Sequence, residues 1–408
     1  MRLRRLVGGL VLGAALGLSR GPFVQNRRAE QRLVVEPPAR LGAAADQSRV
    51  SLGVTEFRFM RRRPFEFTRP SAVKALYVNA WAFGSNRLWQ LVRLADSSDV
   101  NALVVDVKDD TGCLLYRSTV HTARVIGAAA CARTADVRAR LDTLHAHGIY
   151  AIARIGVAKD PLLAEGKPAW SVREGGGLWR DRIGSAWVDA YNDSVWVYSA
   201  ELARETVALG FEEVQFDYVR FPDEPRSRMV KAVFPARRKG ESPREAVRRQ
   251  VQLLTGLVKP LGVPVTFDVF GLTASTTGDL GIGQVWEDFV DVADVVLPMV
   301  YPSHYTRGAF GFRRPNAHPY NVVRLALIDA LARTHGRGAA QIRPYLQAFT
   351  LGRHRPRYTS YEIREQIRAA NDLGIESWVL WNPRSVYHRA ALPPYPLGVP
   401  RAVTSGAE

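Results

Sequence analysis

The chain has 408 residues, of which 47% are hydrophobic and 10% are aromatic. This composition supports a packed core and argues against disorder over most of the length. The formal net charge of +17 could indicate a nucleic-acid-binding protein, but the excess is mainly arginine and is dispersed along the chain. We therefore expect a solvated basic surface and no nucleic-acid partner, while attraction to an anionic envelope or an acidic glycan stays open.

The first 20 residues have the pattern of an export signal. Arg2, Arg4 and Arg5 precede a mostly apolar run over residues 6–18, which is short for a membrane-spanning helix. No small-residue cleavage site follows at once, so an uncleaved membrane tether is the alternative. We expect an exported protein, periplasmic or extracellular, whose residues 21–70 form a linker or lead-in segment.

From residue 71 to about 390, apolar runs typical of strands alternate with segments of helical period. Eight strands alternating with helices predict a single (β/α)8 barrel. The rival is an open doubly wound sheet, but no glycine-rich phosphate turn follows the first strand. Residues 391–408 form a proline-rich tail. The predicted strands span residues 73–82, 102–107, 150–157, 213–219, 265–270, 295–300, 342–349 and 377–381, and the clearest helices span 86–95, 135–147, 194–209, 243–258, 322–332 and 361–373.

Only two cysteines occur, Cys113 and Cys131, 18 residues apart. In an oxidising compartment they could close one loop as a disulfide, and two separate free thiols are the alternative. No histidine is paired with them as a zinc site would require. We expect neither a metal nor a cofactor.

Polar residues occur late in most of the predicted strands, where a barrel of this kind carries its active site. Successive side chains of a strand point to opposite faces of the sheet, so in each strand the polar residue and the residues two positions away from it can all point toward the barrel axis. Any single pair, such as Arg154 with Asp106 or with Asp217, could be a structural ion pair, but burying so many charges for stability alone is unfavourable. The polar residues at strand ends are Asn79, Asp106, Lys108, Arg154, Asp217, Asp268, Gln347 and Asn382.

Aromatic residues crowd the loops beyond those strand ends, and their flat faces suit sugar rings. The alternative is that they pack only against one another, as a small hydrophobic core within a loop that covers the site. Trp381, at a strand end, is the best candidate for a sugar contact. By contrast, Glu213 and Glu376 lie at strand beginnings, which we assign to the face that provides stability.

The stretch FEEVQFDYVRFP at 211–222 resembles the fourth-strand motif of a bacterial family of (β/α)8 barrels described as glycoside hydrolases and long catalogued as a domain of unknown function. The resemblance covers about residues 73–390 and implies a polysaccharide or oligosaccharide substrate. Within the matching stretches, Arg220 and Tyr301 join the candidate substrate-binding residues. Supporting stretches are KALYVN at 74–79, VDVKD at 105–109, FDVFG at 267–271, PMVYPSHY at 298–305 and WVLWN at 378–382.

Glycoside hydrolysis needs two carboxyl groups. We assign Asp217 as the nucleophile and Asp268 as the acid/base, and neighbouring strands favour the separation of roughly 5–5.5 Å of retaining enzymes. Asp106 could orient a hydroxyl or act as the base of an inverting enzyme, and Asp223 and Glu224 are rivals for the donor role.

Two other functions stay open at this point. A barrel that kept its cleft but lost turnover would be a non-catalytic glycan-binding protein. A carbohydrate deacetylase is disfavoured because the strand ends offer no histidine pair, and His304 stands alone. The oligomeric state cannot be predicted from the sequence.

Overall fold

The computed structural model describes residues 68–351 and 356–394. The predicted signal or anchor, almost all of the lead-in segment and most of the proline-rich tail lie outside these residues. Within them, no helix is long and apolar enough to cross a membrane.

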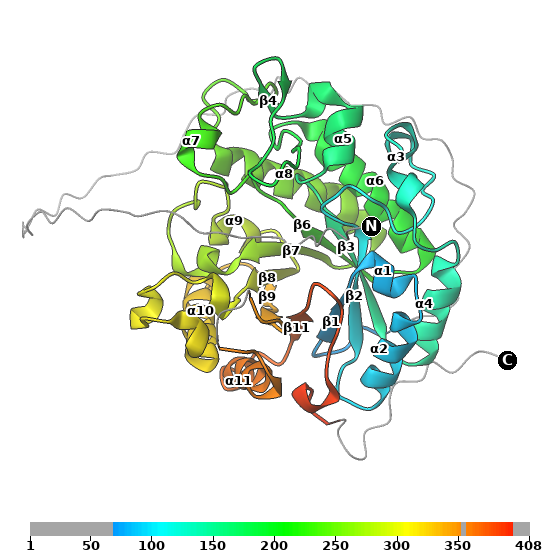
Figure 1. Ribbon diagram of the computed structural model, residues 1–408, viewed down its shortest axis with the longest axis vertical. Coiled ribbons are helices and arrows are strands. Elements are labelled where there is room, and N and C mark those ends of the chain that lie inside the picture. The colour runs from blue at the N-terminus through cyan, green and yellow to red at the C-terminus, as the bar shows by residue number, and fades with distance from the viewer. Residues whose placement is uncertain (1–67, 352–355, 395–408) are drawn as a thin grey trace, which may run out of the picture. The chain divides into compact units, whose positions relative to one another are not determined.

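The centre of the structure is a closed barrel of parallel strands surrounded by helices (Figure 1). Each barrel strand pairs with the barrel strand that follows it in the chain, from β1 to β9, and β1 also pairs with β11. A pairing between Tyr345 and Met299 closes the ring between β10 and β8. Two short strands, β9 and β10, share the seventh position because Pro344, which lacks an N–H, stands between them. The strands are β1 (Lys74–Val78), β2 (Ala102–Lys108), β3 (Tyr150–Gly156), β6 (Glu213–Asp217), β7 (Val265–Phe270), β8 (Val295–Met299), β9 (Gln341–Ile342), β10 (Tyr345–Gln347) and β11 (Trp378–Trp381).

The helices match the segments of helical period in the sequence. In α8, Ser242 and Glu245 form a capping box ahead of the apolar stripe, with Pro243 in the first turn. α6 ends at Gly210, whose φ of 119° only glycine adopts readily. The helices are α1 (Ala80–Phe83), α2 (Arg87–Asp96), α3 (His121–Val125), α4 (Val137–Ala146), α5 (Pro161–Gly166), α6 (Asp193–Leu209), α7 (Arg226–Met229), α8 (Pro243–Val258), α9 (Trp286–Val290), α10 (Pro319–Thr334) and α11 (Ser360–Asn371), and a small hairpin joins β4 (Arg173–Glu174) to β5 (Gly177–Leu178).

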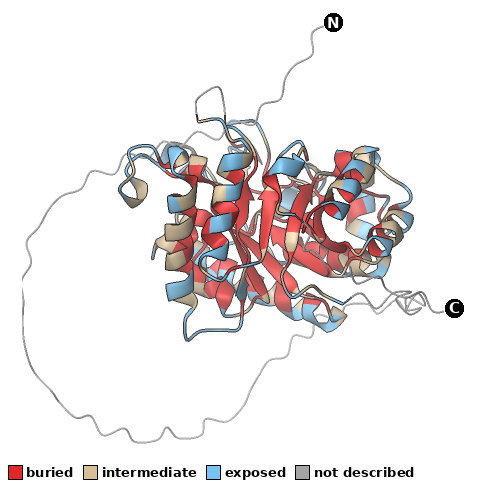
Figure 2. Ribbon diagram, turned by 90° about the horizontal axis from the view of Figure 1, so that it is seen from below, coloured by how far each residue is buried: buried red, intermediate tan, exposed pale blue. Residues whose placement is uncertain are grey.

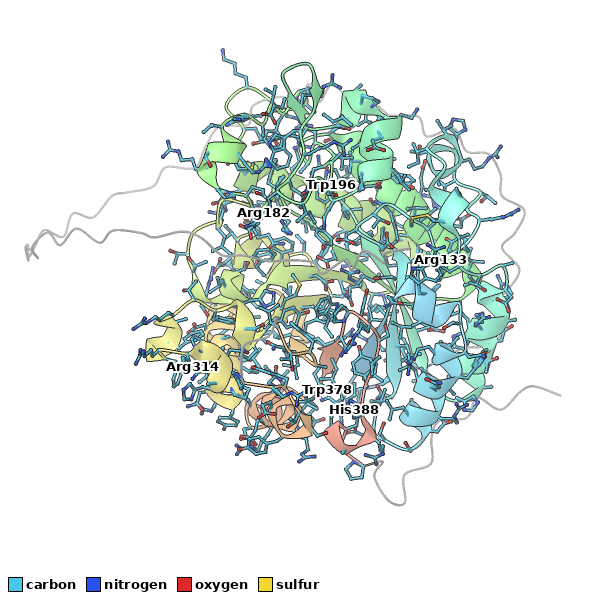
Figure 3. All side chains as sticks on the ribbon, viewed as in Figure 1. Arg133, Arg182, Trp196, Arg314, Trp378 and His388 are labelled. Carbon is cyan, nitrogen blue, oxygen red and sulfur yellow. A yellow bond between two sulfur atoms is a disulfide. The ribbon has the colours of Figure 1, made fainter. Side chains whose placement is uncertain are left out.

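The strands are buried on both faces, as Figure 2 shows. Side chains of one phase, such as Val104, Ile152 and Leu297, pack together inside the barrel. Side chains of the other phase pack against the helices, and the fully buried Trp196 and Trp378 belong to that outer layer (Figure 3). The predicted period-two alternation therefore separates two cores.

A buried ion pair closes the end of the barrel at which the strands begin. Arg343 donates to Glu213 at 2.7 and 3.2 Å, and Tyr150 adds a hydroxyl at 3.3 Å. Both charged side chains are almost fully buried. The assignment of Glu213 to the face that provides stability agrees with this position.

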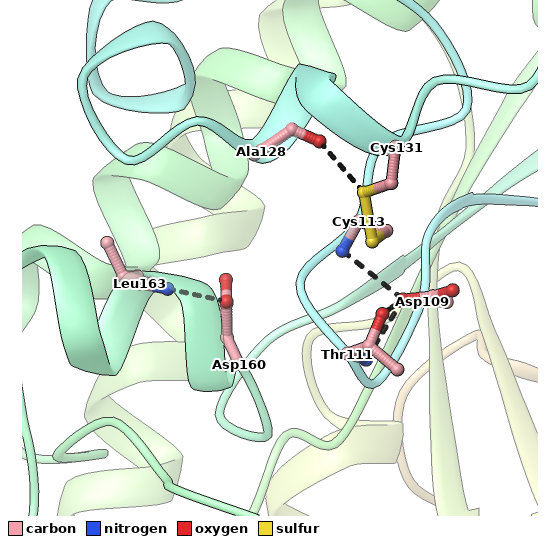
Figure 4. The surroundings of a disulfide bond; sticks show 7 residues. All are labelled: Asp109, Thr111, Cys113, Ala128, Cys131, Asp160 and Leu163. Atoms are coloured by element: carbon pink, nitrogen blue, oxygen red, sulfur yellow. Dashed lines mark hydrogen bonds between the residues drawn. A yellow bond between two sulfur atoms is a disulfide. The ribbon is translucent and has the colours of Figure 1, made fainter.

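Cys113 and Cys131 form a disulfide with Cα atoms 5.8 Å apart (Figure 4). Asp109 lies beside it and accepts hydrogen bonds from the backbone N–H groups of Thr111 at 2.9 Å and Cys113 at 3.3 Å. The predicted disulfide is confirmed, and it fastens the long segment that follows β2.

The first residues of the predicted tail are packed. Leu392 is buried, and the carbonyl of Pro393 accepts a hydrogen bond of 3.2 Å from the N–H of Asp99. The ordered barrel unit therefore extends at least to residue 394.

Candidate active site

One guanidinium group gathers three carboxylates at the end of the barrel where the strands finish. Arg154, near the end of β3, donates from Nη1 to Asp106 on β2 and from Nη2 to Asp217 on β6. Its Nε lies 3.5 Å from Oδ2 of Asp268 on β7. All four side chains are buried, with Arg154 the most exposed at 8%. Four neighbouring strands thus bring together four of the eight residues that the sequence predicted to converge.

Asp217 is held at both of its oxygens. Oδ2 pairs with Arg154, and Oδ1 accepts a hydrogen bond from the backbone N–H of Tyr218. Tyr218 has a φ of 54°, a left-handed conformation that is uncommon for a tyrosine. Such strained backbone concentrates at functional sites, where the surrounding structure enforces it. The turn after β6 therefore fixes the direction in which Asp217 points.

Asp268 has a different environment on the neighbouring strand. Its Oδ2 accepts a hydrogen bond of 3.0 Å from Nε2 of Gln215. Its Oδ1 is buried and has no hydrogen-bond partner in the described part of the chain. Burial raises the pKa of Asp268, and the nearby charge of Asp217 raises it further, against the opposing effect of Arg154. Asp268 is therefore the carboxyl group most inclined to keep its proton.

Asp106 is the third carboxyl group. It receives hydrogen bonds from Arg154 and from the hydroxyl of Tyr77 on β1. Burial raises its pKa to about 6, although Arg154 and the bond from Tyr77 both act to lower it. Asp106 can therefore change its protonation state within the ordinary working range of an enzyme.

An aromatic wall stands beside the carboxylates. Trp381 stacks on Tyr301 with ring centres 5.6 Å apart, and the edge of Phe349 meets Trp381 at 5.2 Å. Tyr77 reaches the same indole at 5.9 Å. Trp381 remains partly exposed, whereas Tyr301 is buried beneath it, so of these two predicted substrate contacts Trp381 is the more accessible.

The structure places Lys108 away from this cluster. Its Nζ lies 2.7 Å from Asp160 and donates to the carbonyl of Gly156 at 2.7 Å, with no exposed surface. The pairing of β2 with β3 shifts register between Asp106 and Lys108. That irregularity breaks the period-two phase on which the prediction of Lys108 as a substrate contact depended.

Three other predicted contacts hold the loops that frame the mouth. Asn79 lies beyond β1 and caps α1 through the N–H of Ala82 at 2.8 Å. Gln347 accepts a hydrogen bond of 3.1 Å from the N–H of Ser303, and Asn382 donates a hydrogen bond of 2.6 Å to the carbonyl of Ala348. The amide side chains thus tie neighbouring loops to each other.

The segment after β6 contains the remaining predicted residues. Arg220 is buried among aromatic rings. Glu224 pairs with Arg182 at 3.1 Å and is largely buried, whereas Asp223 is exposed. Neither Asp223 nor Glu224 contacts Arg154, so neither shares the central cluster.

Sequence reasoning missed Tyr77, Gln215 and Tyr345 as members of the site. Gln215 donates to Asp268 and, at 2.6 Å, to the hydroxyl of Tyr345. Tyr77 and Gln215 share the inward phase of Asn79 and Asp217, so that phase could have identified both residues. The short β10 around Tyr345 offered no comparable pattern.

The described residues contain no group of three or more His, Cys, Asp or Glu side chains placed to hold a metal ion. His304 contacts Tyr301 and Phe349, and burial lowers its pKa to about 4. It is therefore a neutral imidazole within the aromatic wall.

A surface hollow of about 340 Å³ lies at the opposite end, where the strands begin. Glu376 provides the single carboxyl group in its lining. Because glycoside hydrolysis needs two carboxyl groups, the cluster around Arg154 is the better candidate active site.

Comparison with known proteins bears on the fold. Among solved structures, a hypothetical protein from Ruminiclostridium thermocellum is 37% identical, with 48% of this chain and 97% of that chain covered and a TM-score of 0.43. The glycoside hydrolase domain of PgaB (BpsB) from Bordetella bronchiseptica is 18% identical, covering 77% of this chain and 95% of that chain, with a TM-score of 0.52. Alpha-L-fucosidase isoenzyme 2 from Paenibacillus thiaminolyticus is 15% identical, covering 78% and 47%, with a TM-score of 0.51. The last two share the barrel fold.

No curated protein matches the sequence significantly. The family described as "putative glycosyl hydrolase domain" matches residues 75–387, which include every strand of the barrel after the first residue of β1. The chain therefore belongs to this glycosyl hydrolase family.

Proposed function

We propose that the barrel hydrolyses a glycosidic bond in a polysaccharide or oligosaccharide, with Asp217 as nucleophile and Asp268 as acid/base. One observation carries the proposal: two carboxyl groups on adjacent strands share Arg154 but are held differently. Both oxygens of Asp217 have hydrogen-bond partners, whereas Asp268 lies 3.5 Å from Arg154, has one oxygen without a hydrogen-bond partner among the described residues, and has a pKa raised by burial. Pairs of carboxyl groups with such different environments divide the two roles of glycoside hydrolysis between them.

The proposed reaction has two steps. An oxygen of Asp217 attacks the anomeric carbon while the proton of Asp268 passes to the glycosidic oxygen, so the bond to the leaving sugar breaks. Water then attacks the glycosyl ester of Asp217 and gives a proton to Asp268, which restores both carboxyl groups. Arg154 orients Asp217 through their ion pair, and Trp381 offers a ring face to the sugar.

Asp217→Asn tests this assignment. The substitution keeps the shape of the side chain but removes the charge that attacks, so turnover of a glycan hydrolysed by the wild type should fall by roughly 10²–10⁴ or more. Asp223→Asn is the matched control, because Asp223 is an exposed carboxylate on the same segment, and it should retain turnover.

Release of reducing ends and thermal unfolding are measured on the same samples. An Asp217→Asn protein that melts early yet turns over normally would show that Asp217 serves only its ion pair with Arg154. A wild-type protein that binds glycans but releases no product from any of them would support the non-catalytic binding function instead.

We further propose that the protein acts outside the cytoplasm. The arginine-led apolar segment at residues 6–18 fits an export signal, and a disulfide such as Cys113–Cys131 persists in oxidising compartments. A reporter fused after Leu41 should be found outside the cytoplasm, and cytoplasmic activity of that fusion would contradict the proposal.

A further inference from the structure

Arg220 differs from the other buried cations of the barrel. Four Lys or Arg side chains are buried in the described ranges: Lys108, Arg154, Arg220 and Arg343. Lys108 pairs with Asp160, Arg154 with the aspartates and Arg343 with Glu213. Arg220 forms no ion pair with any described residue, and its one hydrogen bond is from Nη1 to the carbonyl of Phe221 at 2.9 Å. Asp217, Asp223 and Asp110 are near enough to favour the charged form of Arg220, but none pairs with it directly, and burying an incompletely paired cation is unfavourable.

Three aromatic rings surround the guanidinium instead of a carboxylate. Its central carbon lies 4.7 Å from the ring centre of Phe270 and 5.1 Å from those of Trp187 and Tyr218. Cation–π contacts of this kind compensate part of the lost hydration. The rings come from the segments after β3 and β6 and from the last residue of β7, so Arg220 lies near the end of the barrel where the strands finish, three residues beyond Asp217.

The donors that remain on Arg220 match one kind of ligand. Nη1 already donates to the carbonyl of Phe221. Nε and Nη2, which lie on one edge of the planar guanidinium, remain available as donors. No nitrogen of Arg220 is among the fully buried polar atoms that lack a partner, so these donors still reach solvent. Two parallel N–H groups are the geometry that binds both oxygens of a carboxylate.

We propose that Arg220 binds the carboxylate of a uronic acid residue in the glycan, so the substrate class is an acidic polysaccharide. This inference rests on the proposed function of the same end of the barrel. The net charge of +17 attracts polyanions over a longer range.

The test compares matched probes on the full-length protein. Uronic-acid-containing polysaccharides are used in their native form and after chemical reduction of each carboxyl group to a primary alcohol. Binding is measured for the wild type, Arg220→Gln and Arg220→Lys. Arg93→Gln is the control, because it removes one exposed positive charge from α2, on the outside of the barrel.

The wild type should bind at least one native glycan roughly 30-fold more tightly than its reduced form, the change expected from the loss of a buried charged hydrogen bond. Arg220→Gln should bind both forms equally, Arg220→Lys should recover part of the difference, and Arg93→Gln should behave as the wild type. Equal binding of native and reduced glycans by the wild type overturns the inference without any variant, as does undiminished preference in Arg220→Gln.

These outcomes are separate from those of the hydrolase proposal. A protein that binds acidic glycans through Arg220 but releases no reducing ends contradicts only the hydrolase proposal. A protein that hydrolyses a neutral glycan and ignores its acidic counterparts contradicts only the uronic acid inference.

Discussion

Arg154→Met is the substitution that most directly probes the centre of the barrel. It keeps much of the side-chain volume but leaves Asp106, Asp217 and Asp268 without their shared cation. Removing one partner of a buried ion pair typically destabilises a protein by roughly 3–5 kcal/mol. We expect a loss of that order in the free energy of unfolding at neutral pH, together with loss of turnover.

The dependence on pH gives this prediction its sharpest form. In the wild type the pKa of Asp106 is raised from 3.8 to about 6, which corresponds to about 3 kcal/mol of stability lost as the pH rises from 4 to 6. Arg154 lowers the pKa of both Asp106 and Asp268, so the variant moves both values further upward. The loss in free energy of unfolding of Arg154→Met relative to the wild type should therefore be largest at neutral pH. It should shrink as acidic pH protonates the carboxylates.

Urea unfolding at pH 4 to 8 measures the deficit, and Arg343→Met is the comparison. Arg343 is even more buried than Arg154 but pairs with Glu213 at the opposite end, so its loss should destabilise the barrel and leave the turnover of the folded protein unchanged. A deficit in Arg154→Met that is the same at every pH would refute the electrostatic reasoning. Normal turnover in that variant would refute the role of Arg154 in the site.

Three further predictions concern residues around the site. Lys108→Met should lower the free energy of unfolding by roughly 3–5 kcal/mol, because it leaves Asp160 buried and unpaired, with turnover of the folded protein unchanged; a selective loss of glycan affinity would return Lys108 to the substrate contacts. Replacing both cysteines by serine should cost about 3 kcal/mol for a loop of 18 residues, and alkylation of both thiols in unreduced protein would contradict the disulfide. Trp381→Ala should weaken glycan binding by roughly 1–3 kcal/mol with an unchanged circular dichroism spectrum, and unchanged affinity would assign Trp381 to packing.

The sequence was most informative where a single physical pattern determines the structure. The strand Val265–Phe270 and the helix Pro243–Val258 have the predicted bounds. In the strand, Val265, Phe267 and Val269 form one apolar phase that packs against the helices. In the helix, a capping box and an apolar stripe define the element from its own residues. The convergence of Arg154 with its aspartates followed from position and phase alone.

Prediction failed where one residue interrupts a pattern. The expected first strand, residues 73–82, ends at Val78 because the side chain of Asn79 caps a helical turn. The seventh strand divides at Pro344, and the register shift after Asp106 sends Lys108 toward Asp160. These outcomes depend on partners distant in sequence, which periodicity cannot represent.

The ion pairs of Arg154 with Asp106 and Asp217 are real, yet they do not make the cluster merely structural. Two other buried ion pairs are matched one to one: Arg343 with Glu213, and Lys108 with Asp160. At the mouth, one guanidinium faces three carboxyl groups, so pairing cannot neutralise all of them. The excess is accommodated by raised pKa values at Asp268 and Asp106. A cluster selected only for stability would not require that imbalance, whereas a hydrolase needs one ionised and one protonated carboxyl group side by side.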